Sequence, residues 1–98
     1  MFDWDEKKNK ANFDKHKIRF EDAKEVFSGH YPSWTFPDAR EDYNEDRFIT
    51  IGPLSPDVML VVVHTQRNGK IRIISARKAN QRERRKYYEY LEKKTMGD

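Results

Sequence analysis

The dipeptide Asn68-Gly69 constrains the fold of this chain more than any other local feature. Asn-Gly suits the positive φ angles of a two-residue type I′ turn, which joins two antiparallel strands. The segments on either side, residues 61–65 and 71–75, are rich in β-branched side chains and are typical of strands. The sequence therefore predicts a β-hairpin here, and an antiparallel sheet built around it.

The rest of the chain alternates helical and extended patterns. A helix is expected from an N-cap at Asp5 to about His16, and a second over residues 20–28 with Gly29 as its stop. The remaining expected elements are strands over residues 2–4, 31–36, 47–52 and 58–63, a turn at 53–57, a loop at 38–46 and a helix over 79–94. This order predicts an α+β fold with helices on one side of a three- to four-stranded antiparallel sheet.

Length and composition narrow the class of protein. The 98 residues suit one domain, residues 1–98, and the absence of cysteine excludes disulfides and cysteine nucleophiles. The longest apolar run, residues 58–63, is far shorter than the roughly 20 residues that span a bilayer. Acids near the N-terminus, with no basic segment leading into an apolar stretch, argue against a secretory signal. We therefore expect a cytoplasmic protein that does not enter a membrane.

The net charge of +3 hides an uneven distribution. Residues 1–50 carry 9 Lys and Arg against 12 Asp and Glu, whereas residues 51–98 carry 11 against 5. Clustered cations attract phosphate, so the second half is the expected surface for a polyanion. The alternative is that these cations only keep an ordinary surface soluble.

The hairpin register sorts side chains onto two faces, because neighbouring residues of a strand point in opposite directions. One face is predicted to carry Thr65, Arg67, Lys70 and Arg72, followed by Val61, Val63, Ile74 and Ala76. The other is predicted to carry Leu60, Val62, His64, Gln66, Ile71, Ile73, Ser75 and Arg77. Facing cations repel unless an anion lies among them, and the planar fork of arginine suits phosphate. Alternatively, these side chains extend into water or pair with the acids of residues 38–46.

A second basic group spans the end of the last strand and the start of the last helix. It contains Arg77, Lys78, Arg82, Arg84, Arg85 and Lys86, with Glu83 as its acid. Cations in the first turn oppose the helix dipole, which is a cost unless they serve a partner. The two alternatives are contact with an RNA backbone and a solvated helical face on which Glu83 pairs with one cation. Tyr87 and Tyr88 could stack on a base or could belong to the core.

The histidines do not indicate a metal site. His16, His30 and His64 are far apart, and the sequence contains no HExxH or CxxC motif and no Gly-rich phosphate loop. We therefore expect no cofactor. Ser75 and His64 lie on neighbouring predicted strands, but no acid is identified to orient them, so they are a weak indication of a nucleophile and base.

Several short segments carry a further pattern: Phe2-Asp3-Trp4-Asp5, Lys15-His16, Phe20-Glu21-Asp22-Ala23, Thr35-Phe36-Pro37-Asp38, Arg47 to Gly52, Val61 to Thr65 and Ile71 to Ala79. Together they resemble the BrnT toxin family from Phe2 to about Tyr90, most specifically in the last segment. Two positions depart from the family pattern. Lys17 stands where a glycine commonly follows Lys-His, and Gln66 stands where Glu usually precedes the arginine matching Arg67. The second departure puts in doubt any mechanism that needs a carboxylate beside Arg67.

The resemblance implies a RelE-like fold with N-terminal helices and a C-terminal helix packed on the sheet. It also implies an endoribonuclease that halts translation until a BrnA-like antitoxin binds it. Antitoxins of this kind carry a ribbon-helix-helix part, so operator DNA would be contacted only through the antitoxin.

These observations predict RNA cleavage without a metal, by attack of a 2′-hydroxyl on the neighbouring phosphorus. Arg67 and Arg72 are predicted to clamp the phosphate, with Arg47 and Arg77 as supporting cations and Thr65 as a hydrogen-bond donor. His64 is the first candidate for proton transfer and His16 the second. The predicted RNA-binding residues are Lys70, Lys78, Arg82, Arg85 and Tyr88. The alternatives are a non-catalytic nucleic-acid-binding module and a protein that only binds other proteins.

Overall fold

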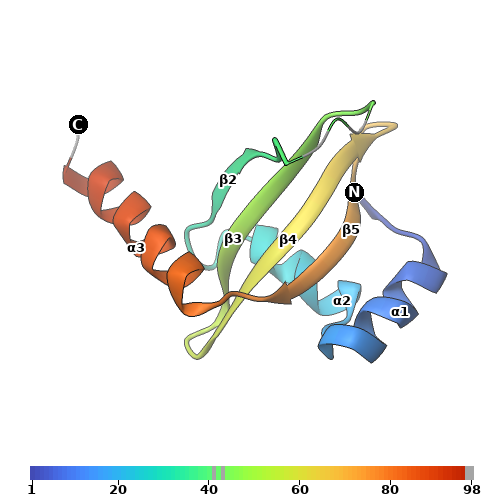
Figure 1. Cartoon of the computed structure of the whole chain (residues 1–98), viewed down its shortest axis with the longest axis horizontal. Coiled ribbons are helices and arrows are strands. Elements are labelled where there is room, and N and C mark those ends of the chain that lie inside the picture. Colours follow the sequence, from blue (N-terminus) through green and yellow to red (C-terminus); the bar gives the residue numbers. More distant parts are fainter. Residues whose placement is uncertain (41, 43, 97–98) are drawn as a thin grey trace.

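The computed structural model describes residues 1–40, 42 and 44–96, and Figure 1 shows their arrangement. Glu41 and Tyr43 of the predicted acidic loop lie outside the described residues. The elements are β1 (Phe2–Asp3), α1 (Glu6–His16), α2 (Phe20–Ala23), the 3₁₀ helix η1 (Lys24–Phe27), β2 (Trp34–Pro37), β3 (Arg47–Ser55), β4 (Val58–Arg67), β5 (Lys70–Lys78) and α3 (Gln81–Met96). The α+β class is confirmed.

The described strands form one five-stranded sheet in the order β1-β5-β4-β3-β2. The sheet is wider than the expected three or four strands because β1 adds to it, pairing in parallel with β5. All other neighbours are antiparallel. Strand β3 is longer than expected and continues through Pro53, where its pairing with β4 is irregular.

The predicted hairpin is confirmed, and its backbone explains why. Asn68 and Gly69 have φ angles of 54° and 76°, which asparagine and glycine tolerate better than other residues. Arg67 pairs with Lys70, and Thr65 pairs with Arg72, as the turn predicts. The first half of the hairpin therefore has the expected register.

A β-bulge at Ile74 changes the register beyond this point. Val63 pairs with Ser75 rather than with Ile74, so one extra residue is inserted into β5. The prediction that Arg77 lies on the opposite face from Arg67 is therefore wrong. Ser75 and Arg77 share the face of Val61 and Val63, and Ala76 lies on the other face.

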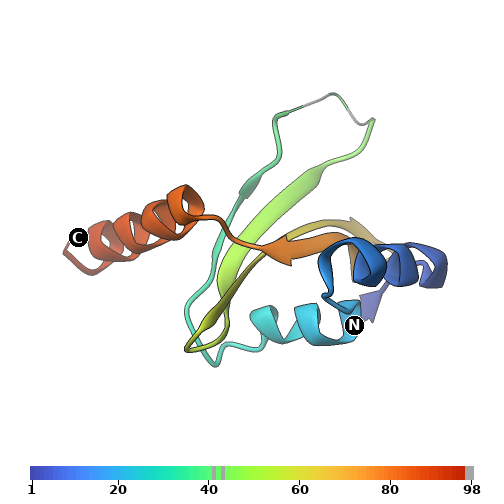
Figure 2. The same ribbon diagram turned by 60° about the horizontal axis from the view of Figure 1, so that its bottom comes forward.

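One face of the sheet is sealed by the N-terminal helices, and Figure 2 shows α1 and α2 on this side. Its core joins apolar residues of the segment 18–26, which contains α2 and most of η1, to Leu60, Val62, Ile73 and Ala76 of β4 and β5. The start of α1 is capped as predicted, because the Asp5 carboxylate accepts hydrogen bonds from the backbone N–H groups of Lys7 and Lys8. Asn12 holds α1 to the edge of β5 by bonding both the N–H and the carbonyl of Ala76.

The C-terminal helix packs on the other face, so the expectation of all helices on one side is wrong. Tyr87 joins Ile51, Met59 and Val61 in a second core cluster. These β4 residues alternate with Leu60 and Val62 and so point the opposite way. Helix α3 covers only one end of this face and extends beyond the sheet (Figure 1). Among the described residues, no helix is both long and apolar enough to cross a membrane.

Candidate functional site

The face that α1 and α2 leave uncovered contains a groove of about 840 Å³, which we call the open groove. Its floor is apolar and consists of Ile49, Ile51, Val61 and Val63 from β3 and β4. The strand order places aromatic residues of β2 along one side and residues of β5 along the other. The groove is also lined by charged and titratable side chains. The basic ones are Lys15, His16, Arg40, Arg77 and Lys86, and the acidic ones are Asp38 and Glu83.

The aromatic wall is a column of three rings. The centroids of Trp34 and Phe36 are 4.5 Å apart, and Trp34 stacks on Tyr90 of α3 at 5.2 Å with 16° between the planes. Trp34 and Phe36 both line the open groove. This wall therefore presents π surface along one side of the groove, which suits contact with a nucleobase.

On the opposite side, Arg77 is held by Glu83. Its two terminal nitrogens donate to the two Glu83 oxygens at 2.8 and 2.7 Å, and the Arg77 side chain remains 37% exposed. These bonds lower the pKa of Glu83 below its usual value and raise the pKa of Arg77. The ion pair therefore stabilises the charged form of both groups.

Glu83 also anchors the start of α3. Its Oε1 accepts a hydrogen bond from the Asn80 N–H at 2.9 Å, and its own N–H donates to Asn80 Oδ1 at 2.8 Å. This reciprocal pair is a capping box, which satisfies N–H groups that a helix start would otherwise leave unbonded. The orientation of Arg77 is thus tied to the first turn of α3.

The predicted Arg67–Arg72 clamp lies outside the open groove. Arg47, Thr65 and Arg72 form a row across β3, β4 and β5, one step of about 7 Å along the strands from the groove floor. Arg72 donates to Asp3 at 2.7 Å, and this hydrogen bond lowers the pKa of Asp3. Arg67 lies two residues beyond Thr65 in β4, next to the hairpin turn.

The alternative of pairing with the acidic loop holds for two of these arginines. Arg47 lies 3.1 Å from one oxygen of Glu45, and Arg67 lies 3.7 Å from the other. Arg47, Arg67 and Arg72 are therefore each paired with a carboxylate, rather than gathered around one common anion site.

Thr65 and His64 are committed to structural contacts. The Thr65 hydroxyl donates to the carbonyl of Asp46 at 2.6 Å, and Thr65 is 2% exposed. His64 lies on the sealed face, as the register predicts, where its Nε2 bonds the Thr50 hydroxyl at 2.7 Å. Burial against Phe27 and Phe48 lowers the pKa of His64 to about 4. Neither side chain is positioned to act on a substrate in the open groove.

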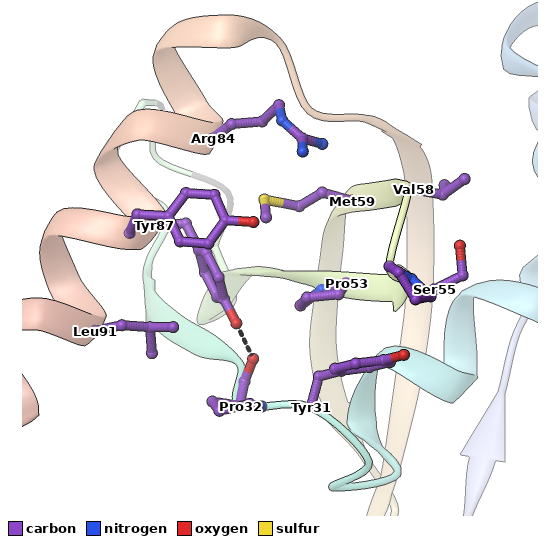
Figure 3. A pocket seen from close by; sticks show the side chains of 11 residues that line it. Tyr31, Pro32, Pro53, Ser55, Val58, Met59, Arg84, Tyr87 and Leu91 are labelled. Atoms are coloured by element: carbon purple, nitrogen blue, oxygen red, sulfur yellow. Dashed lines mark hydrogen bonds between the residues drawn. The ribbon is translucent and has the colours of Figure 1, made fainter.

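The predicted RNA-binding residues are dispersed. Lys70 is exposed at the hairpin turn, Arg82 and Arg85 are exposed on α3, and Lys78 pairs with Leu60 at the far end of β5. Tyr88 is 52% exposed and lines a second, smaller pocket of about 220 Å³ with Arg84. Figure 3 shows this pocket, in which Tyr87 donates a hydrogen bond to the Pro32 carbonyl. Tyr87 is thus a core residue, one of the two alternatives for it.

Sequence reasoning missed Lys15 and the aromatic wall, and ranked His16 second. Lys15 and His16 of α1 lie beside the sheet because Asn12 of the same helix bonds Ala76 of β5. That contact joins residues 64 positions apart in the chain. The Lys15-His16 pair within the family-like segments was the one available signal. No three or more His, Cys, Asp or Glu side chains of the described residues are grouped so that they could hold a metal ion.

Comparison with known proteins identifies the family. A family described as "Ribonuclease toxin, BrnT, of type II toxin-antitoxin system" matches residues 4–83. The chain belongs to the BrnT family. This BrnT chain is similar to the crystal structure of the Brucella abortus ribonuclease toxin BrnT, with 26% identity and a TM-score of 0.64. The match covers 83% of this chain and 99% of the other. A search of curated protein sequences finds no match.

Membership of the BrnT family confirms the predicted class of activity. The protein is a ribonuclease toxin of a type II toxin–antitoxin system, with RNA as substrate and an antitoxin as partner. The open groove of this BrnT chain offers what RNA requires chemically: cations for the phosphates and aromatic rings for the bases.

Proposed function

We propose that this protein cleaves RNA in the open groove by a metal-independent reaction, with Arg77 binding the scissile phosphate and His16 transferring a proton. The observation that carries the proposal is the groove itself, which has rings of β2 on one side and Arg77 on the other. Bases stack on aromatic side chains, and phosphate is bound by guanidinium groups, so a single strand of RNA fits this division.

The reaction we propose uses the RNA's own nucleophile. The 2′-oxygen attacks the adjacent phosphorus and loses its proton, the bond from phosphorus to the 5′-oxygen breaks, and that oxygen gains a proton. The products are a 2′,3′-cyclic phosphate and a 5′-hydroxyl. Negative charge grows on the phosphoryl oxygens in the transition state, and a fixed guanidinium stabilises that charge more than it stabilises the substrate. His16 supplies or accepts a proton from the rim of the groove.

Other cations have supporting roles in this proposal. Lys15 and Lys86 line the groove and add positive charge near the phosphate. Arg47, Arg67 and Arg72 bind phosphates further along the strand, beyond the groove. Their partly exposed ion pairs are worth at most about 1 kcal/mol each, so a phosphate can compete with Glu45 or Asp3.

The regulation we propose follows from the family. A BrnA-like antitoxin neutralises the toxin, and operator DNA is contacted through the antitoxin rather than through this chain. Inhibition of translation results from the loss of RNA.

The test is incubation of the purified protein with labelled single-stranded RNA in the presence of EDTA. Wild-type protein is expected to shorten the RNA and leave cyclic phosphate ends, and Arg77→Ala to slow cleavage about 10²–10³-fold. Arg19→Ala is the matched control, because it removes an exposed guanidinium that stacks on Phe13 of α1, outside the groove. RNA that is retarded in a gel but never shortened would indicate a binding module, and loss of cleavage with EDTA would contradict the metal-free reaction.

A further inference from the structure

We infer that Glu83 is a positioning residue that fixes the orientation in which Arg77 binds the phosphate, and so speeds cleavage. The negative charge of Glu83 at the same time weakens RNA binding. This inference rests on the proposed function, because it assigns Glu83 a role through Arg77. Glu83 and Arg77 both line the open groove, and the Arg77 side chain is 37% exposed.

The geometry points to positioning because the carboxylate is itself fixed. Glu83 accepts two hydrogen bonds from Arg77 and one from the Asn80 backbone, which belongs to the start of α3. An arginine without such a partner samples many rotamers, whereas a guanidinium held at two nitrogens has one orientation. The bulge at Ile74 turns Arg77 to the groove face, and Glu83 then fixes its fork there.

The charge of Glu83 has the opposite consequence for binding. A carboxylate in contact with the guanidinium offsets its attraction for an incoming phosphate, since the two charges act on the phosphate from nearly the same place. Removal of that negative charge should therefore strengthen RNA binding, while release of the guanidinium should slow the chemical step. A residue that only caps α3 would produce neither change.

The decisive variant is Glu83→Gln, because glutamine can still accept the capping hydrogen bond while it lacks the charge. Glu89→Gln makes the same chemical change at an exposed position of α3 and is the matched control. Single-turnover cleavage of labelled single-stranded RNA, measured over a range of protein concentrations, gives the maximal rate and the half-saturating concentration separately.

For Glu83→Gln we expect the maximal rate to fall about tenfold and the half-saturating concentration to fall about threefold. The salt dependence of binding should steepen by about one unit, because one more cation is available to phosphate. Glu89→Gln should leave the maximal rate and the half-saturating concentration within twofold of wild type. Asn80→Ala, which breaks the capping box but leaves the ion pair, should lower the melting temperature and leave the maximal rate within twofold.

Two results would overturn the inference: a Glu83→Gln protein with wild-type kinetics, or one in which binding and rate worsen together. The parent proposal fails separately. If Arg77→Ala cleaves RNA as fast as wild type, the groove is not the site of cleavage. If Arg77→Ala is inactive while Glu83→Gln behaves as wild type, only the role of Glu83 is wrong.

Discussion

The two faces of the sheet are built from alternate residues of the same strands, yet one is sealed and the other is hollow. Val62 is completely buried beneath the N-terminal helices, whereas its neighbour Val63 forms part of the groove floor. The difference arises because the N-terminal helices pack on the first face over the middle of β4 and β5, while α3 covers only one end of the second. In this fold a single strand supplies both the hydrophobic core and the floor of the candidate site.

The comparison also separates the two histidines that the sequence offered as first and second candidates for proton transfer. His64 belongs to the sealed face and is buried among aromatic rings, and His16 lies at the groove rim at the end of α1. A group that transfers protons must reach the substrate, so position decides between them.

The largest effect expected from this comparison is on cleavage. His16→Gln should slow the single-turnover cleavage of labelled RNA about 100-fold, because the groove loses its histidine. His64→Gln should stay within about threefold of wild type, because glutamine can keep the Thr50 hydrogen bond on the far face. Equal losses in both variants, with both proteins folded, would contradict the separation of the two faces.

The second prediction concerns acid stability of the sealed face. The pKa of His64 is lowered from 6.5 to about 4 by burial, so the folded protein keeps it neutral while the unfolded chain takes up a proton below pH 6.5. Its contribution to stability is therefore complete above pH 6.5 and is lost as the pH falls toward 4. We expect a loss of about 2 kcal/mol between pH 7 and 4.5 from this group.

Urea denaturation at pH 7, 5.5 and 4.5 measures this loss. His64→Gln should flatten the pH dependence of the free energy of unfolding between pH 7 and 4.5. An unchanged slope in His64→Gln would mean that other groups cause the acid sensitivity.

Adjacent valines provide a third test of the two faces. Val62→Ala should lower the free energy of unfolding by about 2 kcal/mol, because it leaves a cavity between the sheet and the helices. Val63→Ala should cost about 1 kcal/mol or less, because water in the groove can fill the space left by the methyl groups. Thermal or urea denaturation compares them, and a reversed order would show that the groove face carries more of the stability.

The smallest expected effect lies at the end of α1, away from the floor of the groove. Lys17 has φ 62° and ψ 28°, a left-handed conformation that favours glycine. Lys17→Gly should raise the free energy of unfolding by about 0.5 kcal/mol, after the loss of the Lys17 ammonium bond to the Asp14 carbonyl. RNA cleavage should not change, and destabilisation would show that the side chain contributes more than the backbone strain costs.

Much of the fold was predictable because its signals are local. The Asn68-Gly69 turn, the Asp5 cap and the apolar run of β4 each depend on a few neighbouring residues, and all appear where expected. The family's preference for glycine at position 17 has a local cause too, because the backbone there is left-handed. The candidate site was less predictable, because its members come from α1, β2, β5 and α3.

By itself, the sequence determined the hairpin, the order of helices and strands, the sheet face on which His64 lies and the family to which the chain belongs. Only the tertiary structure decided that Arg77 faces the groove, that Lys15 and His16 reach its rim, and that the hairpin arginines are paired with Glu45 and Asp3. The physical reason is the distance along the chain between the residues that determine each feature. A turn or a cap is settled by a few successive dihedral angles, whereas the bulge and the docking of α1 and α3 depend on packing between segments distant in the chain.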